Sequence, residues 1–298
     1  MKFIVYTPFY DENTGGVIVL YKLAQLLRQF GMKVFLWHEA NPFSVSSLKQ
    51  LERKFRYWRR QHSQRLRYMS PYSLPLARKQ DVHDAIVVYP EVVAGNPLKA
   101  RHVVRWLLYK PGFHTGVIDF SSDDLFFYYL KEYDYPAFNR FPDNQLFVAD
   151  YFLDVYRQTN FGPRHGSCFM VRKGKDRVLN LHPDDAIQVD GLSHRELAEV
   201  FNRSEYFLSY DLYTMYSVYA CMCGCKSVVL PLEGMSVEDW HFSPESRFGV
   251  AYGFEDVPRA LATRGNLLCQ IRQFEENNFS SVRFFLHRCR EFFKISSE

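Results

Sequence analysis

One stretch decides the fold of this 298-residue chain, residues 207–231: FLSYDLYTMYSVYACMCGCKSVVLP. An apolar run ends at Leu208, and a polar loop that contains Asp211 follows it. Apolar residues at helical spacing then run from about Thr214 to Gly224, where a glycine suits the left-handed backbone just past a helix. Val228 to Leu230 reads as a second buried strand. The stretch therefore predicts a strand, a helix and a second strand, the repeating unit of α/β proteins.

The start of that helix is a candidate anion site. A strand that feeds a helix N-terminus leaves free backbone N–H groups at the positive end of the helix dipole. In open α/β sheets this point lies at the carboxyl edge, where ligands bind. The hydroxyls of Thr214 and Ser217 suit phosphate oxygens. The alternative is an ordinary strand–helix–strand unit whose helix is capped internally.

The residues before this stretch add a basic turn to the same half of the chain. Residues 168–171 read as a strand, and Arg172 and Lys173 follow it directly. Arginine can chelate a phosphate and lysine adds a point charge, so the pair suits a diphosphate, with a solvated basic turn as the alternative. Asp190 lies in a turn before a helix over 195–202 that is capped by a Ser-x-x-Glu box.

The first half of the chain predicts another α/β unit. Strands over 3–6 and 34–37 flank a helix over 17–27, and Gly15-Gly16 precedes that helix. Neither a dinucleotide fingerprint nor a phosphate-binding loop of the Walker type is present. Further strands are predicted over 86–89 and 103–109, a short helix after Gly95-Asn96-Pro97, a helix over 125–133 capped from Ser121, and a strand over 146–149. Two helices are expected to finish the chain.

Two residues just past strand ends are candidates for a general base. His114 is the first choice because it lies between two glycines in the loop after strand 103–109, and Glu91 is the second. Parallel sheets carry their chemistry at this edge, and a base must reach the proton that it removes. The alternative for His114 is a loop histidine that bonds to the backbone or to a phosphate.

The stretch that decides the fold resembles the donor-binding segment of GT-B glycosyltransferases. In that family the segment has a Glu, then seven residues of any kind, then the pattern E-A-x-x-x-G-x-P-V-V. Asp211 takes the first acidic position, Ala220 and Gly224 match, and valines close the pattern. Two departures are Tyr219 at the second acidic position and Lys226-Ser227 where the proline is usual. Retaining chemistry is associated with the two-acid version, so the resemblance does not decide between inversion and retention.

The resemblance implies two Rossmann-like domains that face across a cleft, with a C-terminal helix crossing back to the first. The expected domains are 1–140 for the acceptor side, 141–275 for the donor side and 276–298 for the returning helix. The implied reaction moves a sugar from a nucleotide diphosphate sugar to a glycan or lipid-linked glycan acceptor, with no metal and no cofactor. The implied donor-binding residues are Arg172, Lys173, Asp190, Asp211, Tyr213, Thr214, Ser217, Gly15 and Gly16.

Composition adds a basic segment to this expectation. The net charge of +4 is mild, but residues 46–67 carry many Lys and Arg side chains and one acid above an apolar face with Trp58. Such a helix can lie on an anionic membrane or simply dock on its own domain. The six cysteines match no zinc pattern, and no secretory signal or membrane span is evident. We therefore expect a cytoplasmic protein with no nucleic-acid partner, and contact of 46–67 with the inner face of the membrane is left open beside docking on its own domain.

Two other classes compete with the transferase. The first is a protein that keeps the nucleotide-sugar fold as a binding module or scaffold, which Tyr219 in place of an acid favours. The second is a peripheral membrane or nucleic-acid module led by residues 46–67. The donor sugar, the base, the acceptor and the oligomeric state do not follow from the sequence.

Overall fold

The computed structural model describes residues 1–38, 73–177, 180–241 and 243–295. The chain divides into two compact units, the first made of residues 1–150 with 276–298 and the second of residues 151–275. Each unit is built on one five-stranded parallel sheet. The predicted segment 46–67 lies outside the described residues.

The first unit starts with strand β1, helix α1 and strand β2, as the sequence predicts. Its elements are β1 (Lys2–Tyr6), α1 (Gly15–Gln29), β2 (Lys33–Trp37), β3 (Ile86–Pro90), β4 (His102–Leu107) and β5 (Leu125–Tyr128), with single 3₁₀ turns at Lys79–Asp81 and Lys131–Tyr133. Gly31, at φ +76°, closes α1 in the left-handed region that glycine tolerates. The strand order is β2-β1-β3-β4-β5.

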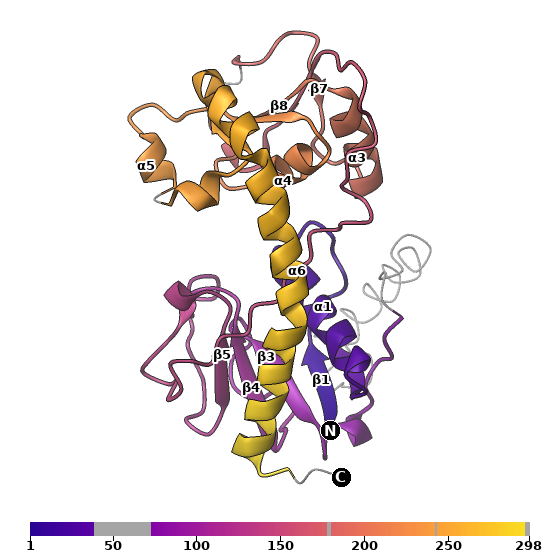
Figure 1. The fold of residues 1–298 in the computed structure, drawn as a ribbon. Helices are drawn as coiled ribbons and strands as arrows, with labels where there is room; N and C mark the ends of the chain where they lie inside the picture. Colours follow the sequence, from indigo (N-terminus) through magenta and orange to yellow (C-terminus); the bar gives the residue numbers. More distant parts are fainter. Residues whose placement is uncertain (39–72, 178–179, 242, 296–298) are drawn as a thin grey trace, which may run out of the picture. The chain divides into compact units, whose positions relative to one another are not determined.

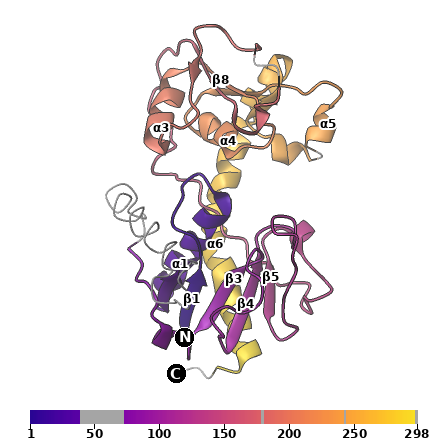
Figure 2. The ribbon, with the colours of Figure 1, turned by 180° about the vertical axis from the view of Figure 1, so that it is seen from behind.

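The two faces of this sheet are covered differently. Helices α1 and α6 (Val257–Phe293) pack on one face, where Val88, Trp106 and Phe285 are among the buried residues (Figures 1 and 2). On the other face, the β3–β4 and β4–β5 connections contain no described helix. Loop residues such as Val93, Leu98 and Phe120 pack there instead.

The second unit repeats the strand order of the first. Its elements are β6 (Ser167–Met170), β7 (Ile187–Gln188), α3 (His194–Arg203), β8 (Tyr206–Ser209), α4 (Met215–Met222), β9 (Lys226–Val229), α5 (Val237–Trp240) and β10 (Val250–Tyr252), with 3₁₀ turns at Arg172–Gly174, Pro244–Arg247 and Phe254–Asp256. The order β10-β9-β8-β6-β7 is the same doubly wound order as in the first unit. Gly224 follows α4 at φ +89°, as the sequence predicts.

Helix α6 belongs to both units, because residues 257–275 fall in the second and 276–293 in the first. Leu267 and Ile271 join the core of the second unit, and Val282 and Phe285 join that of the first. The prediction of two final helices is therefore wrong. Gly265 inside the helix costs about 1 kcal/mol relative to alanine, which the burial on both halves outweighs.

The predicted helix over 125–133 is also wrong. Residues 125–128 form β5, which pairs in parallel with β4, and a single 3₁₀ turn follows at Lys131–Tyr133. Leu-Phe-Phe-Tyr is a strand sequence by intrinsic preference, because aromatic side chains favour the pleated sheet. The supposed cap is a tight turn, in which the Asp124 N–H donates to the Ser121 carbonyl at 3.2 Å.

The predicted strand over 146–149 and the predicted short helix after Gly95 are also wrong, because side chains bond the backbone there in place of regular backbone pairing. Residues 146–149 form no named strand, since the Ala149 N–H donates to the Asn278 side chain of α6 at 2.8 Å. Past Gly95 the chain turns without forming a helix, and the Asn96 side chain bonds both the N–H and the carbonyl of Ala100. In the part of the chain that the structure describes, no helix is long and apolar enough to cross a membrane.

Candidate functional site

The carboxyl edge of the second sheet brings together most of the predicted donor-binding residues. β6 and β8 are neighbours there, with Met170 opposite Ser209, while β7 lies on the outer side of β6. The strand order therefore reverses between β6 and β8, which is where open α/β sheets bind ligands. Arg172 follows β6 and Asp211 follows β8.

Arg172 adopts an uncommon backbone conformation, which Asp190 holds in place. Its φ is +41°, a left-handed value that costs a non-glycine residue about 1–2 kcal/mol. The Asp190 carboxylate accepts the N–H of Arg172 at 2.9 Å and the N–H of Val171 at 3.0 Å. Asp190, which the sequence predicts to be a donor-binding residue, therefore braces the turn after β6, a role that the sequence does not predict.

The exposed Arg172 side chain lies over the first turn of α4. Its guanidinium carbon is 5.0 Å from the centre of the Tyr216 ring. Thr214 is the N-cap of α4, and its Oγ1 accepts the Tyr216 N–H at 3.3 Å. A hydroxyl that accepts one bond keeps its own proton to donate. The basic turn and the helix N-terminus therefore meet at one place.

The next three predicted residues differ in what they offer to a ligand. Tyr213 is 55% exposed. Asp211 is buried, and its Oδ1 accepts the Tyr213 N–H at 3.1 Å, which fixes the turn before α4. Ser217 Oγ is buried and has no hydrogen-bond partner among the described residues. The predicted contact of Ser217 with a phosphate is therefore not accessible in this conformation.

The basic turn is packed against the end of β8. A Cβ atom added at Gly174 would lie 2.4 Å from the Tyr210 carbonyl oxygen, so only glycine fits there. Lys173 is exposed. Sequence reasoning missed Arg177, whose guanidinium donates to the carbonyls of Tyr210, at 2.7 Å, and Pro231, at 2.6 Å. No motif distinguishes Arg177 from the basic residues just before it.

Tyr219, which replaces the second acid of the family pattern, is part of the core. Its ring stacks on Tyr156 with centroids 4.1 Å apart and an interplanar angle of 5°. The Tyr156 hydroxyl in turn lies 2.5 Å from Nδ1 of the buried His194. An acidic side chain at 219 would have to be buried in this aromatic cluster, at a high desolvation cost.

In the first unit, Glu91 lies at the carboxyl edge between β3 and β4. It follows β3 directly, and its Oε2 accepts the N–H of Leu108, the residue after β4, at 2.9 Å. The side chain is buried, and burial raises the pKa of its carboxyl above the ordinary value of 4.5. Hydrogen bonds from the Leu108 and Tyr109 backbone favour the ionised form but do not outweigh the burial.

His114 lies in the loop that begins at the same strand end. It is exposed, and its ring centroid is 5.3 Å from that of Tyr109 and 5.0 Å from that of Phe113. The loop is rich in exposed apolar side chains, including Phe113 and Val117. Tyr109 thus links the two candidate bases, since its backbone faces Glu91 and its ring contacts His114.

Gly15 and Gly16 form the first turn of α1. The N-cap Thr14 makes no side-chain cap bond, and the first N–H groups of a helix have no intrahelical partner. A Cβ atom at Gly15 would meet nothing within 4 Å, and one at Gly16 would meet only Leu108 Cδ1, at 3.6 Å. Neither glycine has a positive φ. The fold of this unit therefore does not require glycine at either position.

Comparisons with known proteins give structural likeness only. No protein-family model matches the sequence, and no curated protein sequence matches it. An α-glucosyltransferase solved with UDP and a 13-mer DNA containing an HMU base is 12% identical, with a TM-score of 0.45 over 95% of each chain. The T4 phage BGT in complex with its UDP-glucose substrate is 8% identical, with a TM-score of 0.42 over 98% of this chain and 97% of that one. MurG of Acinetobacter baumannii is 11% identical, with a TM-score of 0.39 over 97% and 99%.

The chain's own topology defines the class of fold. Two Rossmann-like units with the same parallel strand order occur in one chain, and a terminal helix returns from the second unit to the first. This is the element order of the GT-B fold.

Proposed function

We propose that this chain is a glycosyltransferase that moves a sugar from a nucleotide diphosphate sugar to a glycan or lipid-linked glycan acceptor, without a metal ion. The observation that carries the proposal is the position of Arg172. It is exposed in a strained conformation at the strand-order reversal, with its guanidinium over the first turn of α4. Strain of this kind persists where the surroundings enforce it, and it concentrates at functional sites.

The proposed role of this cluster is to hold the leaving diphosphate. Negative charge develops on the leaving group as the glycosidic bond breaks, and fixed donors aimed at that charge lower the barrier. Arg172 and Lys173 supply positive charge, and the α4 N-terminus adds the Thr214 hydroxyl proton and the helix dipole. Asp211, which the sequence favours as a contact for a ribose or sugar hydroxyl, is buried, and its proposed role is to fix the turn before α4.

Between the two candidate bases, the geometry favours Glu91. Its carboxylate is fixed by the Leu108 N–H, and burial raises its pKa, which makes it a stronger proton acceptor than an ordinary carboxylate. His114 is exposed, and the rings of Tyr109 and Phe113 lie against it. We therefore assign the general base to Glu91 and a position in the acceptor loop to His114.

A nucleotide-sugar-binding protein without catalysis is the second candidate. Tyr219 favours it, because the position that is acidic in the family pattern is filled here by a buried aromatic ring. The two candidates share the donor site and differ in turnover.

Incubation with UDP-, GDP-, CMP- and dTDP-sugars tests the proposal, with nucleotide release as the readout and EDTA in a parallel arm. The acceptor arms are a short-chain lipid-linked saccharide and a free glycan. We expect acceptor-dependent release with one donor in the presence of EDTA, lost in Arg172→Ala and reduced in Glu91→Gln. Binding without release would favour the non-catalytic candidate, and release abolished by EDTA would contradict metal independence.

A further inference from the structure

We propose that Arg105 is a positioning residue that holds the Glu91 loop in place and so orients the general base. The inference rests on the proposed function for the role of Glu91, but the structural coupling between the two residues can be measured without turnover. Arg105 lies on β4 opposite Tyr89 of β3, and it is among the largest fully buried side chains of the described chain.

The loops that cover the Arg105 face of the sheet explain why a cation is buried there. The connections around residues 91–101 and 108–124 contain no described helix, so loops cover this face. Loops bring unpaired backbone carbonyls into the interior, and each needs a donor. A guanidinium has five N–H donors in a fixed fork, which suits several acceptors at once.

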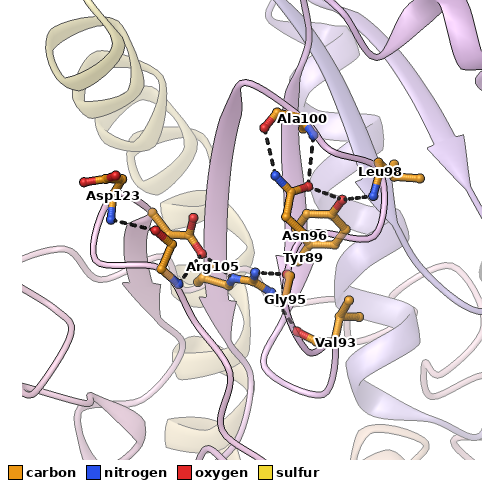
Figure 3. Close-up of polar contacts among 10 residues, drawn as sticks. Tyr89, Val93, Gly95, Asn96, Leu98, Ala100, Arg105 and Asp123 are labelled. Carbon is orange, nitrogen blue, oxygen red and sulfur yellow. Dashed lines mark hydrogen bonds and ion pairs between the residues drawn. The ribbon is translucent and has the colours of Figure 1, made fainter.

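The guanidinium of Arg105 connects two loops (Figure 3). Its Nη1 donates to the Val93 carbonyl at 2.7 Å, and its Nη2 donates to the Gly95 carbonyl. On the other side, its Nε donates to Asp124 Oδ2 at 2.7 Å. Val93 and Gly95 belong to the loop that begins at Glu91, and Asp124 precedes β5. One side chain therefore joins the two loops that close this face.

Aromatic rings and a second polar group complete the cluster. The Arg105 guanidinium carbon is 5.0 Å from the centre of the Tyr89 ring and 5.1 Å from that of Phe120. The Tyr89 hydroxyl donates to Asn96 Oδ1 at 3.1 Å and accepts the Leu98 N–H at 3.1 Å. In the loop after Glu91, Val93 and Gly95 are thus bonded to Arg105, Leu98 to Tyr89, and Ala100 to Asn96, as Figure 3 shows.

The loop matters for Glu91 because the carboxylate is buried at its first residue. The Leu108 and Tyr109 backbone and the Tyr133 side chain face this carboxylate, and among the described residues no cation contributes to the shift of its pKa. The two ways in which Arg105 could act on Glu91, through its charge or through the position of the loop, therefore predict opposite changes in the Glu91 pKa. If Arg105 acted by charge, its removal would raise the pKa of Glu91. If it holds the loop closed, its removal admits water and lowers that pKa.

Lysine is the informative replacement. Arg105→Lys keeps the positive charge, but a single ammonium cannot reproduce the planar fork that reaches both loops. Asp124→Asn keeps the shape of the other partner and removes its charge, so it is a milder change. Arg101→Met alters an exposed arginine on the same connection and is the matched control.

The experiment follows the Glu91 carboxyl by ¹³C NMR titration, assigned with Glu91→Gln, together with hydrogen exchange of the bonded loop amides of Val93, Gly95 and Leu98. In Arg105→Lys we expect the Glu91 pKa to fall toward its ordinary value of 4.5 and the loop amides to exchange on the order of 10-fold faster. Asp124→Asn should change both in the same direction by less, and Arg101→Met should change neither.

An unchanged or raised Glu91 pKa in folded Arg105→Lys, with unchanged exchange, would overturn the positioning role. If the enzyme turns over, the same variant should lower kcat more than it raises KM and should move the acid limb of the kcat profile to lower pH. A protein with no turnover would contradict the proposed function while leaving the NMR result to decide the role of Arg105.

Discussion

Replacing Asp190 with alanine is the sharpest probe of how the donor site is built. The Asp190 carboxylate accepts the backbone N–H groups of Val171 and Arg172, and Arg172 has a φ of +41°. Without that acceptor, the backbone of Arg172 can return to an ordinary conformation. The preference regained is about 1–2 kcal/mol, the usual cost of the left-handed region.

That free energy sets the size of the expected effect. A change of one to two kcal/mol corresponds to a factor of about 5–30 in population. Apparent affinity falls in proportion to the fraction of molecules in the binding-competent conformation. Asp190→Ala should therefore weaken nucleotide binding by about 5–30-fold. The same substitution should lower the free energy of unfolding by about 1.5 kcal/mol. This is the lower end of the range for hydrogen bonds to a charged acceptor, which applies because the Asp190 carboxylate is partly exposed.

The assay is calorimetric titration with whichever of UDP, GDP, CMP and dTDP binds the wild type. Asp184→Ala, which removes an exposed carboxylate nearby in the sequence, is the control. Since Asp190 is argued to act through Arg172, its substitution should cost no further affinity in an Arg172→Ala background. Additive losses in this double-mutant cycle, or full affinity in folded Asp190→Ala, would refute the reasoning.

Three further predictions concern single positions. Gly174→Ala forces a Cβ against the Tyr210 carbonyl oxygen. Thermal unfolding should show that the free energy of unfolding falls by about 1–3 kcal/mol. An unchanged Tm would mean that the turn is not packed as described. Gly16→Ala, where the nearest atom is Leu108 Cδ1 at 3.6 Å, should leave Tm unchanged and reduce sugar transfer, and unchanged transfer would remove Gly16 from the ligand site. Burial raises the pKa of Glu91 above 4.5, so the folded protein loses stability as pH rises from 4.5 through the folded pKa. Urea titrations should find Glu91→Gln more stable than wild type at about pH 7 and equally stable below about pH 4. A stability difference that does not depend on pH would contradict a raised pKa.

The sequence predicts the elements that local pattern controls. The β8–α4–β9 unit, the Ser193 capping box on α3 and the left-handed Gly224 are all confirmed, because each depends on residues within a few positions of one another. The helix predicted over 125–133 is wrong because the cap-like turn at Ser121 favoured a helix, whereas the aromatic residues 125–128 prefer the strand that pairs with β4.

The parts of the site that the sequence could not predict depend on distant partners. Arg105 lies between apolar neighbours in β4, and nothing local indicates that Asp124 and the Gly95 loop will surround it. Asp190 was assigned to the ligand rather than to the Arg172 backbone, because an aspartate in a turn has the same local signature in either role. The roles of the predicted site residues in binding and catalysis stay predictions.

The central claim is that Arg172 and the α4 N-terminus form a site for a nucleotide diphosphate. Calorimetric titration with UDP, GDP, CMP and dTDP tests it most directly, on wild type, Arg172→Ala and the control Arg203→Ala, whose exposed arginine precedes β8 at the opposite edge of the sheet. The account predicts micromolar binding of one of the three diphosphates, strongly weakened in Arg172→Ala and kept in Arg203→Ala. Binding of none of the three diphosphates by the folded wild type, binding of the monophosphate CMP alone, or equal binding by all three proteins would contradict it.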